Sequence, residues 1–186
     1  MLIEHRPGSN VMVDLETLDT QPSAIILSIG ACLVTHGEPS VPFYRSISVD
    51  SCVDAGMTES ASTRKFWDNQ PAEARAVFTD PNQIPVIQAL GDFAEYLRSF
   101  GSGSVRVWGN GSDFDNVILA DAYRRFGFDL PWRFYNNSCF RTVRKLIGAG
   151  MVEPERQGTY HNALDDAQHQ ARILGHMLSK GQVSWT

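Results

Sequence analysis

Alternating and nearly continuous apolar stretches predict three strands near the start of the chain. Within Val11–Glu16 the odd-numbered residues are apolar and point to one face, while the even-numbered residues point to the other. Ala24–Val34 is almost continuously apolar, as expected of a strand buried on both faces. Phe43–Val49 alternates again. Because the connections between the three are short, we expect an antiparallel meander.

Apolar residues at intervals of three and four then predict helices separated by short strands. The first helix carries apolar positions from Ile84 to Leu97 and is expected to stop at Gly101 and Gly103. The remaining predicted elements are a strand over Val105–Trp108, a helix over Asn116–Phe126, a strand over Phe134–Ser138, a helix through Ile147 and a helix from Ala163 to Ser179. Strands followed by alternating helices and strands predict an α/β domain with a mixed sheet.

Composition is that of an ordinary globular protein, with 42% hydrophobic and 20% charged residues in 186. We expect one domain over residues 1–186. The longest apolar run, Ala24–Val34, is too short to span a bilayer, and residues 1–10 lack the apolar region of a secretory signal, so we expect a cytoplasmic protein with no membrane partner. Cys32, Cys52 and Cys139 lack CxxC spacing and are interpreted as reduced thiols packed in the core.

Net charge is −5, which argues against a protein that coats nucleic acid by bulk attraction. A protein that grips a few nucleotides through metal ions remains compatible with this charge. Residues 130–152 contain no acid and four cations, namely Arg133, Arg141, Arg144 and Lys145. Phosphate contacts and a solvated helix face are equally good interpretations of this segment.

Two acids at the end of the first predicted strand are the first candidates for chemistry. Asp14 and Glu16 are two residues apart, so both side chains leave the same face of the strand. A single acid there would be read as a cap or turn residue. Two adjacent carboxylates repel each other unless a cation lies between them. The pair therefore makes a metal site a specific hypothesis.

The segment WGNGSDFDN places two more acids between a strand and a helix. Asp115 lies within about 60° of the apolar face of the helix that follows, so we expect it to point toward the core. A buried carboxylate costs several kcal/mol, on the order given by transfer energies, unless a cation pairs with it. Asp113 stands at the helix entrance, where an acid is a good N-cap.

The last predicted helix separates another adjacent pair of acids. Asp166 lies at the edge of its apolar face, whereas Asp165 lies on the opposite, solvated side with His169. His161 precedes the helix in a loop that contains Gly150, Pro154 and Gly158, and we expect its imidazole to lie near Asp166. A zinc site of His161, Asp165 and His169 is a weaker alternative. His5, His36 and His176 are interpreted as surface residues.

In this order, the motifs Asp14-Leu15-Glu16-Thr17, Asn110-x-x-x-Phe114-Asp115 and His161-x-x-x-x-Asp166 resemble those of the DEDDh branch of DnaQ-like 3′–5′ exonucleases. The resemblance covers about residues 11–178. It implies an RNase H-like fold, with a mixed five-stranded sheet flanked by helices. The compact length and the WGNGSDFDN segment look most like the small phage DexA-type and RNase T-like members.

The resemblance also implies the chemistry of the site. Two Mg²⁺ ions, for which Mn²⁺ would substitute, would be held by four carboxylates, namely Asp14, Glu16, Asp115 and Asp166. His161 would be the general base, a role that suits a side chain titrating near pH 6.5. The implied substrate contacts are Thr17 and Leu18 at the terminal 3′ nucleotide, with Asn110, Phe114 and Trp67 as further pocket residues. Phe66 and Trp67 are otherwise interpreted as packing residues.

The reaction implied by the resemblance is hydrolysis of single-stranded DNA or RNA from the 3′ end to 5′-mononucleotides. Two alternatives stay open: a phosphodiesterase acting on short oligonucleotides, and a catalytically weak module of the same fold that binds nucleic-acid ends. The implied partner is a single-stranded 3′ end. A homodimer also stays open, since dimers are common among the RNase T-like and oligoribonuclease-like relatives.

Overall fold

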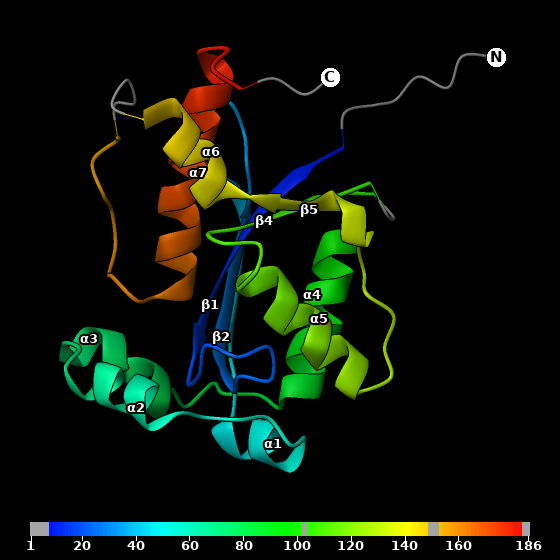
Figure 1. The fold of residues 1–186 in the computed structure, drawn as a ribbon, viewed down its shortest axis with the longest axis vertical. Coiled ribbons are helices and arrows are strands. Elements are labelled where there is room, and N and C mark those ends of the chain that lie inside the picture. The colour runs from blue at the N-terminus through cyan, green and yellow to red at the C-terminus, as the bar shows by residue number, and fades with distance from the viewer. Residues whose placement is uncertain (1–7, 102–103, 149–152, 184–186) are drawn as a thin grey trace.

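A mixed five-stranded sheet runs through the centre of the protein in the order β3-β2-β1-β4-β5 (Figure 1). The computed structural model describes residues 8–101, 104–148 and 153–183. The strands are β1 (Asn10–Thr17), β2 (Ile26–Leu33), β3 (Ser40–Ser46), β4 (Arg106–Gly109) and β5 (Asn137–Cys139). The first three strands pair antiparallel, whereas β4 runs parallel to β1 and to β5. The predicted meander and mixed sheet are confirmed.

Helices cover both faces of this sheet. They are α1 (Val49–Asp54), α2 (Ala61–Asp68), α3 (Ala72–Arg75), α4 (Val86–Arg98), α5 (Asp115–Arg125), α6 (Phe140–Ile147) and α7 (Ala163–Ser179), with 3₁₀ turns η1 (Ala76–Thr79) and η2 (Phe134–Asn136). Figure 1 shows α6 and α7 on one face and α4 and α5 on the other, with α1, α2 and α3 near one end of the sheet. In the part of the chain that the structure describes, no helix has the length and apolar character needed to cross a bilayer.

The alternation in β1 divides the core into two. Val11, Val13 and Leu15 belong to the cluster that α4 and α5 complete. Met12 belongs to the second cluster, which contains apolar residues of α6 and α7. Asp14 and Glu16 follow Met12 in the same register, so they lie on the α7 face of the sheet, as the alternation predicts.

A glycine in β2 lets the start of α7 approach the sheet closely. A Cβ at Gly30 would lie 2.1 Å from the carbonyl carbon of Ala163 and 2.2 Å from the nitrogen of Leu164. Since Gly30 pairs with Asp14 across β1 and β2, this approach brings the first turn of α7 over the acidic end of β1. The glycine thereby positions the two parts of the candidate site.

Two predicted strands are wrong in part. Phe134–Ser138 is a strand only from Asn137; before it, Asn136 N–H donates to the Arg133 carbonyl at 2.8 Å and closes the η2 turn. Phe134 is 76% exposed there, because no core lies opposite it. The strand predicted to end at Val49 ends at Ser46, since Ser48 caps α1, whose first residue is Val49.

The segment with α1, α2, α3 and η1 has no predicted counterpart. Ser60 caps α2 by accepting a hydrogen bond from Thr63 N–H at 3.2 Å. The helix ends with Trp67 buried, and its indole Nε1–H donates to the Thr17 carbonyl at 2.8 Å. This bond ties α2 to the carboxyl end of β1, beside the acidic residues.

Candidate active site

A cleft of about 510 Å³ opens at the carboxyl end of β1. The predicted site residues that line it are Asp14, Glu16, Thr17, Trp67, Asn110, Phe114, His161 and Asp166. They come from β1, α2, the β4–α5 connection and the start of α7. Segments far apart in the sequence therefore meet at one place, as the three motifs predict.

Asp115 belongs to the site, although it is buried and does not line the cleft. It is the first residue of α5, which follows the carboxyl end of β4, and β4 is the parallel neighbour of β1. Its Oδ1 accepts a hydrogen bond from Leu15 N–H at 3.2 Å, and the residue is 2% exposed. The predicted inward orientation is confirmed. Asp113 does not cap the helix: the N-cap is Phe114, which has no side-chain cap bond, and Asp113 is exposed.

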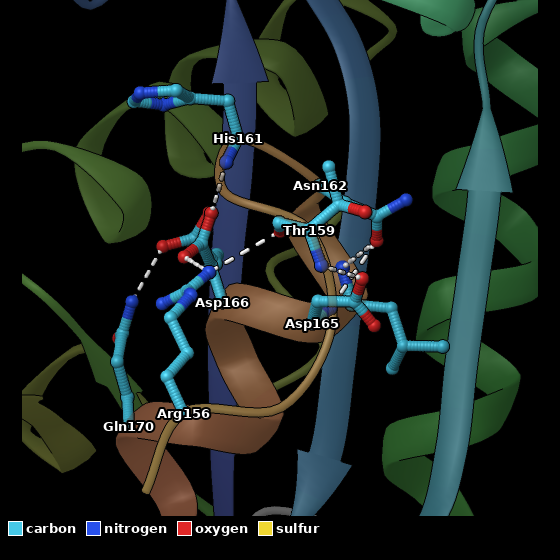
Figure 2. A network of polar contacts seen from close by, with 9 residues as sticks. Arg156, Thr159, His161, Asn162, Asp165, Asp166 and Gln170 are labelled. Carbon is cyan, nitrogen blue, oxygen red and sulfur yellow. Dashed lines mark hydrogen bonds and ion pairs between the residues drawn. The ribbon is translucent and has the colours of Figure 1, made fainter. Parts of the chain in front are cut away.

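Asp166 and His161 come together at the start of α7 (Figure 2). Asn162 caps the helix by accepting hydrogen bonds from Leu164 N–H at 3.1 Å and Asp165 N–H at 3.2 Å. His161 has a φ of 60°, a left-handed conformation that histidine adopts more readily than most residues. In this conformation its N–H donates to Asp166 Oδ2 at 2.9 Å. The predicted proximity of the two residues is confirmed.

One donor set in the cleft has the composition of a metal site. A ring nitrogen of His161 and carboxylate oxygens of Glu16 and Asp166 all lie within 4.8 Å of one another. Hard divalent ions favour carboxylate oxygens, and an imidazole nitrogen is a common ligand of several divalent metals. Among the described residues, no second group of three or more potential ligands lies this close.

The acidic cluster holds an excess of negative charge. Burial, followed by the charges of Asp115, Glu16 and Asp166, raises the pKa of Asp14 well above its usual range. Burial, with the charges of Asp166 and Asp115, raises the pKa of Glu16 to about 8. Burial also raises the pKa of Asp115 to about 7, against the opposing effect of its hydrogen bond from Leu15. A cation among these carboxylates would relieve the repulsion, so the residues fit a divalent metal.

Two residues of the cluster were missed by sequence reasoning. Arg156 Nη2 donates to Asp166 Oδ1 at 2.5 Å and to the Thr159 carbonyl at 3.2 Å, with its guanidinium 3.8 Å from the ring centre of Tyr160. Gln170 Nε2 donates to Asp14 Oδ1 at 2.7 Å. Gln170 follows Asp166 by one helical turn, so its spacing could have revealed it; no spacing signals Arg156.

Not all of the residues expected to contact substrate line the cleft. Thr17 lines the cleft, but its hydroxyl already donates to the Asp19 carbonyl at 2.7 Å. Leu18 does not line the cleft and is fully buried in the core, so in this structure it cannot wedge against a base. The ring of Phe66, which is 42% exposed, lies 5.1 Å from that of His161 and at right angles to it. Phe66 is therefore a cleft residue as well as a packing residue.

The other described acids and histidines that the sequence singled out lie outside the acidic cluster. Asp165 does not face solvent freely: its Oδ2 accepts a hydrogen bond from Thr159 N–H at 2.7 Å, which fastens the preceding loop to α7 (Figure 2). Within the described part of the chain, His161, Asp165 and His169 do not form a group of close ligands. His36 and His176 are exposed as predicted. His5, Gly103 and Gly150 lie outside the described residues.

The cysteines carry no further site. All three are free; Cys32 and Cys52 are buried in the core as predicted, and Cys139 is half-buried beside Thr142.

The model of the family described as 3′–5′ exoribonuclease Rv2179c-like domain matches residues 9–178. The nuclease domain of 3′hExo, a DEDDh family member bound to rAMP, is similar at 16% identity and a TM-score of 0.58, covering 95% of this chain and 94% of that one. Exonuclease X in complex with 5′ overhanging duplex DNA is similar at 17% identity and a TM-score of 0.59, with coverage of 95% and 94%.

A larger protein contains a region of similar fold. E. coli exonuclease I in complex with a 5cy-dT13 oligonucleotide is similar at 19% identity and a TM-score of 0.57, over 95% of this chain and 41% of that one. No curated protein matches the chain. At these identities the structures establish the fold alone, which is the RNase H-like fold of DnaQ-type exonucleases, as predicted.

Proposed function

The chain belongs to the 3′–5′ exoribonuclease Rv2179c-like domain family, a class of 3′–5′ exonucleases, and from that premise we propose that it removes 5′-mononucleotides from single-stranded 3′ ends with two divalent cations. RNA is the expected preferred substrate, because the family is described by its action on RNA. We also propose that residues 1–186 act as one exonuclease domain. Its WGNGSDFDN segment supports a proposed place among the small phage DexA-type and RNase T-like members.

The observation that carries this proposal is the group of carboxylates at the carboxyl end of β1, where burial raises the pKa values of Asp14, Glu16 and Asp115, beside Asp166 and His161. Asp14, Glu16, Asp115 and Asp166 would hold the ions, which we propose to be Mg²⁺ or Mn²⁺. The chemistry that a bound pair of ions supplies is activation of the attacking water and stabilisation of the departing 3′ oxygen. Gln170 keeps Asp14 oriented through its hydrogen bond to Oδ1.

His161 is the proposed general base. Its imidazole accepts the proton of the attacking water, whose oxygen forms the new bond to phosphorus while the bond to the 3′ oxygen of the preceding nucleotide breaks. The His161 N–H bond to Asp166 holds the residue at the cleft, and the rings of Phe66 and Trp67 contact the imidazole edge to face. These contacts restrict where the base can point.

The terminal nucleotide would lie between α2 and the β4–α5 connection. Thr17 offers its backbone there, and the Trp67 indole fixes that backbone through the bond to the Thr17 carbonyl. Phe66 is exposed enough to contact a base, whereas Asn110 and Phe114 line the facing side of the cleft. We therefore propose these five residues as the pocket for the 3′ nucleotide.

Identification of the product tests this function. The purified chain is incubated with single-stranded RNA or DNA in Mg²⁺ or in EDTA, and the products are identified by mass spectrometry. We expect 5′-mononucleotides in Mg²⁺ and none in EDTA, with Asp14→Asn inactive and still folded by circular dichroism. Release of 3′-monophosphates, or full activity of Asp14→Asn, would contradict the proposed chemistry.

A further inference from the structure

A second groove, of about 550 Å³, adjoins the cleft at Asn110, which lines both. Three cations of α6 line this groove, namely Arg141, Arg144 and Lys145. Positions three and four residues apart lie on one face of a helix, so the three side chains point the same way. We refer to this feature as the α6 groove.

The cations of the α6 groove are only partly neutralised. Arg141 donates to the Asn110 carbonyl, which brings its guanidinium to the rim of the cleft. Arg144 forms an ion pair with Glu153, the acid that lines the groove. Among the described residues no carboxylate pairs with Lys145. The groove is therefore locally positive on a chain whose net charge is −5.

A third groove, which adjoins the cleft at His161, has the opposite charge. It measures about 390 Å³ and is lined by Glu73 and Asp80. No lysine or arginine of the described chain lines it. Phosphodiester groups that leave the cleft in this direction would meet two carboxylates, whereas those that leave past Asn110 would meet three cations.

We propose that the α6 groove binds the sugar-phosphate backbone on the 5′ side of the terminal nucleotide. This inference rests on the proposed exonuclease function and adds a direction to it: the strand leaves the cleft past Asn110 and crosses α6, away from Glu73 and Asp80. Contacts to phosphates do not distinguish one base from another. The α6 groove should therefore raise the affinity for longer strands whatever their sequence. A substrate that occupies only the cleft does not contact the α6 groove, so its affinity should not depend on the groove.

Removing the charge of Glu153 should have the opposite effect on strand binding from removing the charge of Lys145. The Glu153 carboxylate forms an ion pair with Arg144. A phosphate that binds Arg144 must therefore compete with this carboxylate. Removing the charge of Glu153 frees one cation and strengthens binding of the strand. Removing the charge of Lys145 weakens it. A purely structural role of either residue would not produce changes in opposite directions.

The test compares two variants with matched controls. Lys145→Gln and Arg124→Gln each remove one positive charge, and Arg124 is an exposed arginine of α5 outside the groove. Glu153→Gln and Glu155→Gln each remove one negative charge from the same loop, and Glu155 does not line the groove. We measure kcat and KM for a 12-nucleotide single strand in Mg²⁺ at several salt concentrations, and hydrolysis of the p-nitrophenyl ester of thymidine 5′-monophosphate.

We expect Lys145→Gln to raise KM about threefold to tenfold for the strand with kcat unchanged, and to reduce the salt slope of log KM by about 0.7, the value for one contact to a single-stranded phosphate. Glu153→Gln should lower KM. The ester, which reaches only the cleft, should be hydrolysed equally by all variants. Arg124→Gln and Glu155→Gln should behave as the wild type.

Two results separate failure of the inference from failure of the proposed function. If the wild type hydrolyses both substrates but Lys145→Gln and its control change KM equally, the α6 groove does not bind the strand. If the wild type hydrolyses neither substrate, the proposed function fails and the inference fails with it.

Discussion

Replacing Asp115 with Asn should stabilise the metal-free protein while abolishing its activity. Asp115 is 2% exposed, and burial raises its pKa from 3.8 to about 7. Above pH 7 the folded chain must therefore hold a buried charge that the unfolded chain exposes to water. An Asn at this position still accepts the hydrogen bond from Leu15 N–H through its side-chain oxygen, although its amide nitrogen cannot accept from the backbone N–H groups of Asn110 and Asp115.

The magnitude follows from the two pKa values. Because the folded state binds the proton more tightly than the unfolded state, the contribution of this group to stability is complete below pH 3.8 and is lost as pH rises to about 7. At about 1.36 kcal/mol per pKa unit, the loss is about 4 kcal/mol at pH 8 and about 2 kcal/mol at pH 5. Asp115→Asn avoids this loss because an amide does not ionise.

Urea unfolding in EDTA at pH 5 and pH 8 measures the effect. Asp115→Asn should exceed the wild type in free energy of unfolding by more at pH 8 than at pH 5. Asp113→Asn is the control, since Asp113 is exposed two residues away and should change little. An Asp115→Asn variant that is no more stable than the wild type at pH 8, or whose advantage is independent of pH, would refute this reasoning.

Three further substitutions test the proposed general base His161, the loop residue Arg156 and the close approach of α7 to Gly30. His161→Ala should lose activity but bind Mn²⁺ in calorimetry; absence of binding would show that the residue is a ligand. Arg156→Gln should lower the free energy of unfolding in EDTA by about 1–3 kcal/mol, since it removes the ion-pair partner of the Asp166 carboxylate, yet tighten Mn²⁺ binding. Gly30→Ala should destabilise by about 1–3 kcal/mol in thermal unfolding because the new methyl meets backbone, whereas Gly91→Ala, with open space around it, should not destabilise.

Much of the fold was predictable because its local patterns are strong. The alternation in β1 placed Asp14 and Glu16 on one face correctly, and the apolar spacing gave α7 its observed bounds, Ala163–Ser179. The prediction for the segment at Phe134 was wrong because Phe134 and Tyr135 resemble strand residues in composition, but they are exposed and contact each other without packing into either core cluster. A local sequence pattern predicts burial correctly only where residues of the core pack against the segment.

The site was predictable where its residues follow a periodic element. Asp166 and Asp115 have helical positions that place them relative to an apolar face, and both lie as expected. Arg156 lies in a loop whose path is set by tertiary contacts, so no spacing could place it beside Asp166. Leu18 was assigned to the pocket by resemblance, whereas its side chain completes the core.

The most direct test of the central claim is digestion of a 5′-labelled single strand followed on a sequencing gel. RNA and DNA of the same sequence are incubated with the purified chain in Mg²⁺, in Mn²⁺ or in EDTA. We predict a ladder that shortens one nucleotide at a time from the 3′ end in either metal, faster for RNA, and no shortening in EDTA. Internal cleavage without a ladder, or shortening that persists in EDTA, would contradict a metal-dependent 3′–5′ exonuclease.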